Sequence, residues 1–399
     1  MAHHVSALST PATRSGPLRV LYLIDSLVPG GAERSLAAMA PYLVNGGIRL
    51  EVATLHQRPG VQAELVAAGA RLHDLSGPGG RVGWFRRTER LVRELRPDLV
   101  HTTLFEADLA GRAAAAVRRV PVVSSLVNVA YGPEQQASSG VGRLKLGGAR
   151  WLDAATARPV VRFHAVSRYV ADVMAARLHL RRSRVEVVTR GRDPELLGRR
   201  DPERRERARA ALGVDPGTQV VLAAARHEPQ KGLDTLIAAV PEVLAEMPRA
   251  RFFLAGREGT QTPALLALVD RLDVGDAVRM LGARSDVLDL LCAADVFAFP
   301  TRWEGMPGAI LEAMALRAPI VASDLPPVRE AVSDGLSARL VAPDRADLLA
   351  GAIAETLADP DAAAAQAARA EADFHARFTI GRAASGMLAF YEHALSAAR

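Results

Sequence analysis

Short apolar segments alternate with amphipathic segments along most of the chain. In the first half, six apolar runs are predicted to be buried strands: Arg19–Ile24, Arg49–Leu55, Leu99–Thr102, Val120–Leu126, Phe163–Val166 and Val185–Thr189. Helical periodicity characterises the stretches between them, including Glu33–Leu43, Gln62–Ala68, Gly83–Leu95 and Leu109–Arg118. Short buried strands that alternate with helices indicate a parallel sheet covered on both faces.

The same alternation restarts after a charged break. Residues 191–216 are rich in Arg, Asp and Glu, and we predict a linker with a short solvated helix there. The strands predicted beyond it are Val220–Ala224, Arg251–Ala255, Val278–Leu281, Val296–Phe299 and Ile320–Ala322. The helices predicted between them are Leu233–Met247, Pro263–Leu272, Val287–Ala293 and Ile310–Leu316. The chain is therefore expected to form two similar α/β domains, with ligands bound in the cleft beyond the carboxyl ends of their strands.

These patterns divide the chain into four parts. We predict a disordered lead-in at 1–17, an N-terminal α/β domain at 18–192, a second α/β domain at 193–373 and a final helix at 374–399. The final helix has an apolar face, so we expect it to pack on the domains.

The segment from Phe299 to Met314 combines a strand end, a glycine-rich turn and a helix start. Pro307 suits a helix start, because proline lacks an N–H that the first turn could not use. The backbone N–H groups that could then point at an anion belong to Gly305, Met306 and Gly308. A phosphate would repel the carboxylates of Glu304 and Glu312, so we expect both to face the neutral part of a ligand. A sugar nucleotide fits this turn, although a glutamate near a helix start can equally be a partner of the helix dipole.

A second loop supplies positive charge. Arg226 and Lys231 follow the strand Val220–Ala224 and lie five residues apart. An arginine fork and a lysine ammonium could offset the charge of a departing diphosphate, although a solvated loop is the simpler interpretation of Lys231 alone. Further strand-end glycines, which let a ligand approach closely or only form tight turns, are Gly30, Gly31 and Gly256.

Together these residues resemble the retaining glycosyltransferases of family 4, which have the GT-B fold. That fold is α/β, with two Rossmann-like domains facing each other across a cleft and a C-terminal helix that crosses back to the first domain. The resemblance extends from Pro29 to Glu330 and is strongest in the second half, where two glutamates are separated by seven residues. It implies that Glu312 holds the ribose of the donor and that Glu304 engages the transferred sugar.

The resemblance also implies a set of site residues. The catalytic residues would be Arg226, Lys231 and Glu304. The donor-binding residues would be Gly30, Gly31, Arg226, Lys231, Gly256, Glu304, Gly305, Met306, Pro307 and Glu312. No metal and no cofactor would be needed, and the donor would be a nucleotide-diphosphate sugar such as a UDP- or GDP-sugar. The acceptor would be a glycan, a lipid-linked molecule or a small molecule.

The chain departs from the family pattern in three places. Val127 stands near the position of a histidine that many members have beside the sugar, which leaves His101 and Asn128 as acceptor-side candidates. Arg190-Gly191 replaces the usual Asn-Gly before the linker, and Pro326-Pro327 replaces the common Gly-Gly after the last strand. The sugar preference of the family therefore does not transfer to this chain.

Composition limits the other classes of function. Of 399 residues, 49% are hydrophobic, so two packed domains are expected. Only 5% are aromatic, so we expect no aromatic platform for nucleic acid, although the net charge is +6. The single cysteine, Cys292, excludes an internal disulfide, and we expect it to be buried. No apolar run approaches the roughly 20 residues that span a bilayer, so we predict a cytoplasmic location. The basic and apolar segment 131–162 is compatible with peripheral binding at the anionic inner face of the cell membrane and equally with a solvated surface.

Two other functions remain open. A nucleotide-sugar epimerase of the same architecture would need acid and base side chains around the sugar, which the sequence does not clearly provide. A non-catalytic nucleotide-sugar-binding homologue would agree with the missing histidine but not with the presence of Arg226, Lys231, Glu304 and Glu312.

Overall fold

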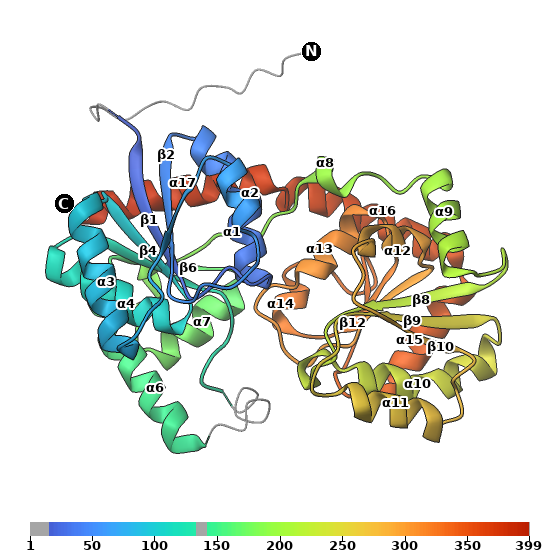
Figure 1. Ribbon diagram of the computed structural model, residues 1–399. Helices are drawn as coiled ribbons and strands as arrows, with labels where there is room; N and C mark the ends of the chain where they lie inside the picture. The colour runs from blue at the N-terminus through green and yellow to red at the C-terminus, as the bar shows by residue number, and fades with distance from the viewer. Residues whose placement is uncertain (1–15, 133–141, 399) are drawn as a thin grey trace, which may run out of the picture.

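The computed structural model describes residues 16–132 and 142–398, which form two parallel β-sheets flanked by helices (Figure 1). In the first sheet the strands lie in the order β3-β2-β1-β4-β5-β6-β7. These strands are β1 (Leu18–Ile24), β2 (Ile48–Thr54), β3 (Arg71–Asp74), β4 (Leu99–Thr103), β5 (Val122–Leu126), β6 (Arg162–Ala165) and β7 (Val185–Val187). Every neighbouring pair is parallel, as the alternating pattern predicts.

Helices cover both faces of this sheet. They are α1 (Gly31–Asn45), α2 (Gln62–Ala67), α3 (Gly80–Leu95), α4 (Phe105–Arg118), α6 (Arg143–Thr156) and α7 (Arg168–Arg177). Successive residues of β1 pack on opposite sides: Tyr22 belongs to the core cluster that includes α1, and Leu23 to the cluster that includes α4. This two-sided burial explains why β1 is a continuous apolar run rather than an alternating one.

The second sheet has the strand order β10-β9-β8-β11-β12-β13 and is also parallel throughout. Its strands are β8 (Gln219–Ala224), β9 (Ala250–Ala255), β10 (Val278–Gly282), β11 (Val296–Phe299), β12 (Ile320–Ser323) and β13 (Arg339–Val341). Its helices are α10 (Leu233–Glu246), α11 (Thr262–Arg271), α12 (Val287–Ala293), α13 (Gly308–Ala315), α14 (Pro326–Arg329) and α15 (Ala346–Ala358). Cys292 is a free, buried thiol on α12, as predicted.

The linker contains two short helices, α8 (Pro194–Leu197) and α9 (Pro202–Leu212). Each follows an aspartate that caps its first amides and begins with a proline, which is a typical helix start. The predicted helix is thus present, but it is not simply solvated. Arg205 and Arg209 of α9 pair with Asp295 at 2.5 and 3.2 Å and so fix the helix to the second domain.

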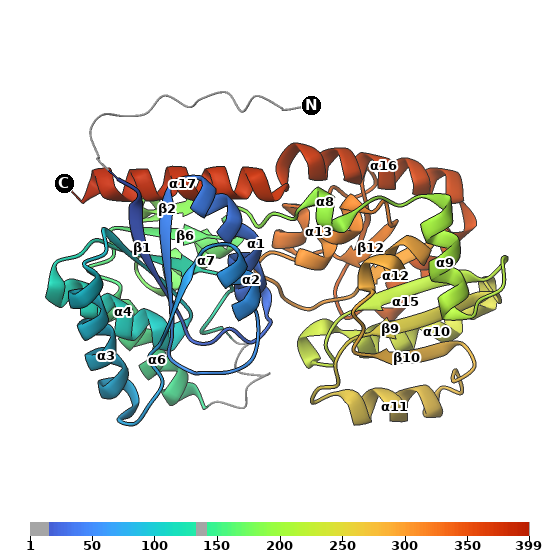
Figure 2. The ribbon, with the colours of Figure 1, turned by 45° about the horizontal axis from the view of Figure 1, so that its top comes forward.

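The C-terminal segment forms two helices, α16 (Pro360–Arg377) and α17 (Ile380–Ala397). α17 corresponds to the predicted final helix at 374–399 but begins at Ile380, because the chain breaks between the two helices. Figure 2 shows α16 along the second domain and α17 along the first, so the chain crosses back between the domains. At the crossing, the Arg192 N–H donates to the Phe378 carbonyl at 2.9 Å, and the Ile380 N–H donates to the Arg192 carbonyl at 2.8 Å. The outgoing linker and the returning chain therefore lie side by side between the two domains.

Candidate functional site

The turn that follows β11 holds the two glutamates of the sequence motif. Glu304 accepts a hydrogen bond from Lys231 Nζ at 2.5 Å and another from the Thr301 hydroxyl at 3.1 Å. Pro307 is the residue before α13, which begins at Gly308, two residues earlier than predicted. The Met306 side chain is buried in the core, so only its backbone can face a ligand. The structure thus joins Glu304 to the predicted phosphate-binding lysine, 73 residues away along the chain.

The loop between β8 and α10 packs closely on its neighbours. Gly232 has a φ of +61°, and a Cβ at this position would clash with the Pro300 carbonyl of the Glu304 turn. A Cβ on Gly256, at the end of β9, would clash with the Ala225 carbonyl. Arg226, the next residue, has an exposed side chain. These glycines therefore bring the carboxyl ends of β8, β9 and β11 together, and Arg226 lies at the surface of that assembly.

Glu312, on α13, pairs with an arginine from the linker. The Nε of Arg192 donates to Glu312 Oε1 at 2.7 Å. Its guanidinium also covers Gly308, where a Cβ would collide with it. The second carboxylate of the motif is thus partnered by a cation that motif comparison did not predict.

α1 begins at Gly31, two residues before the predicted start, and Arg190, which directly precedes the linker, lies against the Gly30-Gly31 turn. A Cβ on Gly31 would be 2.5 Å from Arg190 Nη1. Burial, and secondarily repulsion from Arg192, lowers the pKa of Arg190 to about 10. The Gly-Gly turn is therefore covered by a guanidinium.

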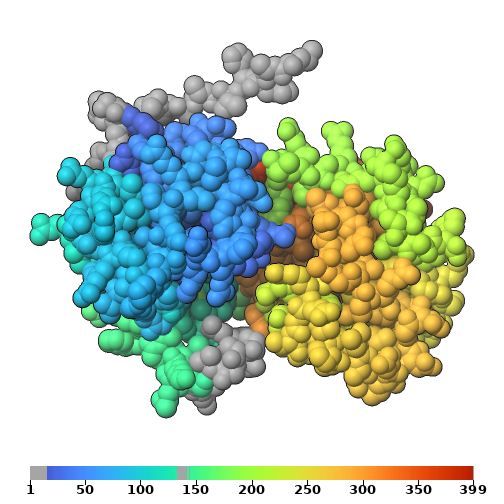
Figure 3. Space-filling view, in the orientation of Figure 1, coloured from blue at the N-terminus to red at the C-terminus, as the bar shows by residue number. Residues whose placement is uncertain are grey.

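The two domains meet at the Glu304 turn. Figure 3 shows them in contact on either side of a recess. The Ser167 hydroxyl of the first domain donates to the Gly305 carbonyl at 2.8 Å. A Cβ on Gly305 would meet the Val127 carbonyl and the Cα of Asn128, so the backbones touch at that glycine. Asn128 is exposed beside this contact, which agrees with a place next to the candidate site.

His101, an expected acceptor-side residue, lies instead in the core of the first domain and is 1% exposed. Its Nδ1 contacts the Tyr391 hydroxyl and its Nε2 the Ser125 hydroxyl, both at 2.7 Å. Ser125 continues to His164 Nδ1 at 2.8 Å, and His164 Nε2 to the Val188 carbonyl at 2.9 Å. We therefore do not retain His101 as a residue that binds an acceptor.

The directions of these hydrogen bonds follow from the Val188 carbonyl, at which the chain of contacts ends. A carbonyl only accepts, so His164 donates from Nε2 and accepts at Nδ1 from Ser125. Ser125 then accepts from His101 Nε2, and His101 Nδ1 accepts from Tyr391. Both imidazoles are neutral in this arrangement, which agrees with pKa values that burial lowers for each of them.

Among residues 16–132 and 142–398, no group of three or more His, Cys, Asp or Glu side chains could hold a metal ion. No helix in the same ranges is long and apolar enough to cross a membrane.

Two family models match the chain. The model described as Glycosyltransferase Family 4 covers residues 29–196, and the one described as Glycosyl transferases group 1 covers residues 218–359. A D-inositol 3-phosphate glycosyltransferase of Kineococcus radiotolerans is 30% identical over 92% of this chain and 88% of its own length. The chain belongs to glycosyltransferase family 4.

Other relatives match a smaller part. A D-inositol 3-phosphate glycosyltransferase of Segniliparus rotundus is 35% identical over 53% of this chain and 47% of its own length, so the chain spans about half the length of that relative. Among solved structures, Anabaena HepE in complex with UDP and glucose has a TM-score of 0.82 at 22% identity, with 94% of this family 4 chain and 99% of HepE covered. WaaG, a glycosyltransferase involved in lipopolysaccharide biosynthesis, has a TM-score of 0.69 at 18% identity, with 88% and 94% covered. These likenesses confirm the predicted two-domain GT-B fold.

Sequence reasoning missed three site features of this family 4 chain. Arg190 and Arg192 were noted only as a departure and as part of a charged linker. Glu330 was noted only as the end of the family resemblance. It accepts hydrogen bonds at 2.8 Å from the N–H groups of Arg168 and Tyr169, and so caps α7 of the other domain. No local sequence signal identifies these partners, because each lies more than 100 residues from the group it contacts.

Proposed function

We propose that this family 4 protein is a retaining glycosyltransferase that moves a sugar from a nucleotide-diphosphate sugar to a hydroxyl group of an acceptor, without a metal ion. The observation that carries the proposal is the Lys231–Glu304 contact, which joins the predicted cation and the predicted sugar-facing carboxylate at the strand ends of one domain. The alternatives are a nucleotide-sugar epimerase and a non-catalytic protein that binds a nucleotide sugar.

In the proposed reaction, the bond between the anomeric carbon and the diphosphate oxygen breaks. The acceptor hydroxyl oxygen bonds to the same face of that carbon, and its proton passes to the departing diphosphate. Lys231 and Arg226 offset the negative charge that develops on the diphosphate, which is the largest electrostatic demand of the step. Glu304 accepts a hydrogen bond from a sugar hydroxyl, and Glu312 from the ribose.

The nature of the donor and acceptor is also a proposal. HepE was crystallised with UDP-glucose, which supports a UDP-sugar over a GDP-sugar as the first donor to test. The relatives named D-inositol 3-phosphate glycosyltransferases support a small phosphorylated polyol as one acceptor to set beside glycans and lipid-linked molecules.

We further propose that α6 binds an anionic membrane surface. Leu144 and Trp151 on this helix are 93% and 72% exposed, and Lys145 and Arg150 are exposed beside them. An exposed tryptophan among cations is typical of a helix that lies at a lipid interface. The test is co-sedimentation with vesicles in which about 30% of the lipid is anionic, a composition at which surface charge attracts basic segments. We expect less protein to sediment in Trp151→Ala than in wild type. Sedimentation that is independent of anionic lipid would contradict this proposal.

The function is tested with a panel of UDP-, GDP- and ADP-sugars in the presence of EDTA. We expect one nucleotide class to raise the melting temperature, and transfer to an acceptor to be lost in Lys231→Ala and Glu312→Ala while both variants stay folded. Full activity in both variants would contradict the site assignment. Sugar interconversion without acceptor would indicate the epimerase, and donor binding without turnover would indicate the non-catalytic homologue.

A further inference from the structure

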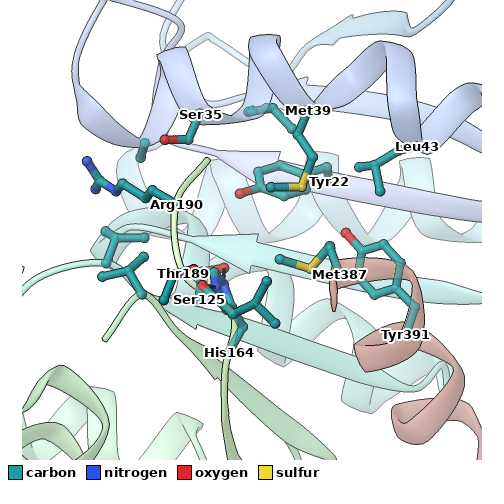
Figure 4. Close-up of a pocket in the computed structure, with 15 residues that line it drawn as sticks. Tyr22, Ser35, Met39, Leu43, Ser125, His164, Thr189, Arg190, Met387 and Tyr391 are labelled. Atoms are coloured by element: carbon teal, nitrogen blue, oxygen red, sulfur yellow. Dashed lines mark hydrogen bonds between the residues drawn. The ribbon is translucent and has the colours of Figure 1, made fainter. Parts of the chain in front are cut away.

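The side chain of Arg190 enters the space between the domains from the segment that leaves β7. Figure 4 shows its guanidinium at the end of a cavity nearest Ser35, at the start of α1, and away from Tyr391. Its Nη1 lies against Gly31. Its Nε is buried, and Arg190 has no hydrogen bond or ion pair with any residue in the described ranges.

This lack of a partner, together with the burial of its Nε, distinguishes Arg190 from Lys231 and Arg192, and from the exposed Arg226. Lys231 is paired with Glu304, and Arg192 with Glu312. A charged side chain that is taken out of water without a partner is costly, and desolvation accordingly lowers the pKa of Arg190 to about 10. The guanidinium stays charged at neutral pH, and the carboxylates of Glu33 and Glu304 act on it through space without a hydrogen bond or ion pair to it in the described ranges.

The start of α1 adds to that positive charge. The helix spans 15 residues and begins after Gly30, which has no side chain to cap it. Glu33 in the first turn accepts hydrogen bonds from the backbone N–H groups of Gly30 and of Glu33 itself, so these two amides are not free. The other first-turn N–H groups and the helix dipole remain positive, so Arg190 and this part of the helix repel each other. An anion between them would be attracted by both: the guanidinium fork could bind two of its oxygens, and the first amides of α1 a third.

We propose that Arg190 binds the diphosphate of the donor from the side opposite Lys231 and Arg226. The carboxylate of Glu304 acts on the pKa of Arg190, so the guanidinium lies within electrostatic range of the Glu304 turn as well as of Gly31. The diphosphate is the part of the proposed donor that carries several negative charges, and it is long enough to contact both domains. This inference rests on the proposed function, because it takes the ligand to be a nucleotide-diphosphate sugar.

Arg190 belongs to the segment between the domains, whereas Lys231 and Arg226 belong to the second domain. A diphosphate held by all three and by the first turn of α1 would connect this segment to both domains. Donor binding should then resist the separation of the domains, which a nucleoside without phosphates would not do.

The test measures binding of UDP, GDP and the two nucleosides, uridine and guanosine, by calorimetry with Arg190→Gln and Arg190→Lys. The matched control is Arg199→Gln, because Arg199 lies in the same linker with an exposed side chain and gives the same change in charge. We expect Arg190→Gln to weaken binding of the preferred nucleoside diphosphate roughly tenfold to a hundredfold, as the loss of charged hydrogen bonds implies. Nucleoside binding and the control should be unchanged, and Arg190→Lys should lie between.

The outcomes separate this inference from the proposed function. If the wild-type protein binds neither UDP nor GDP, the same titrations are made with ADP. If it binds none of the three, the proposed function fails and the inference with it. If wild type binds a nucleoside diphosphate and a folded Arg190→Gln binds it equally well, only the inference is overturned. A rise in KM for the acceptor with unchanged nucleotide affinity would likewise overturn it, because Arg190 would then contact the acceptor. Melting temperatures and circular dichroism of all variants show which are folded.

Discussion

Each glutamate of the sequence motif is held by a cation that uses only one of its two carboxylate oxygens. Lys231 and Thr301 both contact Oε1 of Glu304, and Arg192 contacts Oε1 of Glu312. The other oxygen of each carboxylate can still accept hydrogen bonds from hydroxyl groups. The cations therefore orient the glutamates without saturating them, which suits side chains that are proposed to bind a sugar and a ribose.

This geometry predicts that Arg192 supports donor binding. In Arg192→Ala, Glu312 loses the hydrogen bond that fixes its orientation, so we expect the KM for the nucleotide sugar to rise about tenfold. The effect should vanish in a Glu312→Gln background, because Arg192 would act through that carboxylate. Tighter donor binding in Arg192→Ala would contradict the prediction and show that Arg192 competes with the ribose for Glu312.

At the scale of elements, the interior strands were predictable, whereas two of the four edge strands, β3 and β13, were missed. β11 is apolar throughout, and β8 from Val220 onward, because both faces are buried, whereas β3 reads Arg-Leu-His-Asp and lies at the sheet edge, so its sequence lacks an apolar run. β13, at the edge of the second sheet, was missed for the same reason. The break between α16 and α17 was also missed, because Phe378 continues the apolar pattern across it.

The candidate site shows the same limit. Lys231, Glu304 and Glu312 could be selected as site candidates from the sequence. Each belongs to a local strand–turn–helix pattern, which glycine and proline positions reveal. Their partner Arg192 and the interdomain contacts of Glu330 depend on how two domains pack, which short-range periodicity does not encode. The burial of His101 was unpredictable in the same way, since its partner Tyr391 lies on α17, 290 residues away.

The hydrogen-bonded chain from Tyr391 to Val188 predicts a pH dependence of stability. Burial, and secondarily the charge of Arg190, lowers the pKa of His164 from 6.5 to about 4, although its bond to Val188 opposes the shift. The unfolded chain therefore binds more protons than the folded protein between these pH values, and the free energy of unfolding should fall as pH drops from 6.5 to 4. The full contribution of His164 is about 3 kcal/mol.

Urea unfolding at pH 7.5, 6.5, 5.5, 4.5 and 3.5, a series that brackets the shifted range (roughly 4 to 6.5), tests this in wild type and His164→Gln. The glutamine can still donate to Val188 but does not titrate, so its stability should depend less steeply on pH. Comparing the two proteins cancels the opposite effect of Asp108, whose pKa burial raises to about 7. Equal slopes would mean that His164 is protonated in the folded protein.

At the scale of the whole molecule, two contacts hold the domains across the recess beside the site. Ser167 binds the Gly305 carbonyl of the turn that holds Glu304, and Glu330 caps α7 from the opposite domain. The α7 amides are positive at the helix start, so a carboxylate there is stabilised by the dipole as well as by hydrogen bonds. The first domain thus helps to position the turn of the second domain that holds Glu304.

Glu330→Ala should therefore shift the protein toward a more open arrangement of its domains. Loss of two hydrogen bonds at a partly exposed site is expected to weaken the domain contact by about 1 to 2 kcal/mol, after allowance for solvent screening. Small-angle X-ray scattering should then show a larger radius of gyration, and a nucleoside diphosphate should reverse the change if it contacts both domains. Glu371→Ala is the matched control, because Glu371 pairs with Arg317 inside the second domain and should leave the scattering unchanged. An unchanged radius in Glu330→Ala would mean that the pairing of the Arg192 backbone with Phe378 and Ile380, together with the packing of α17 on α1, is sufficient to fix the domains.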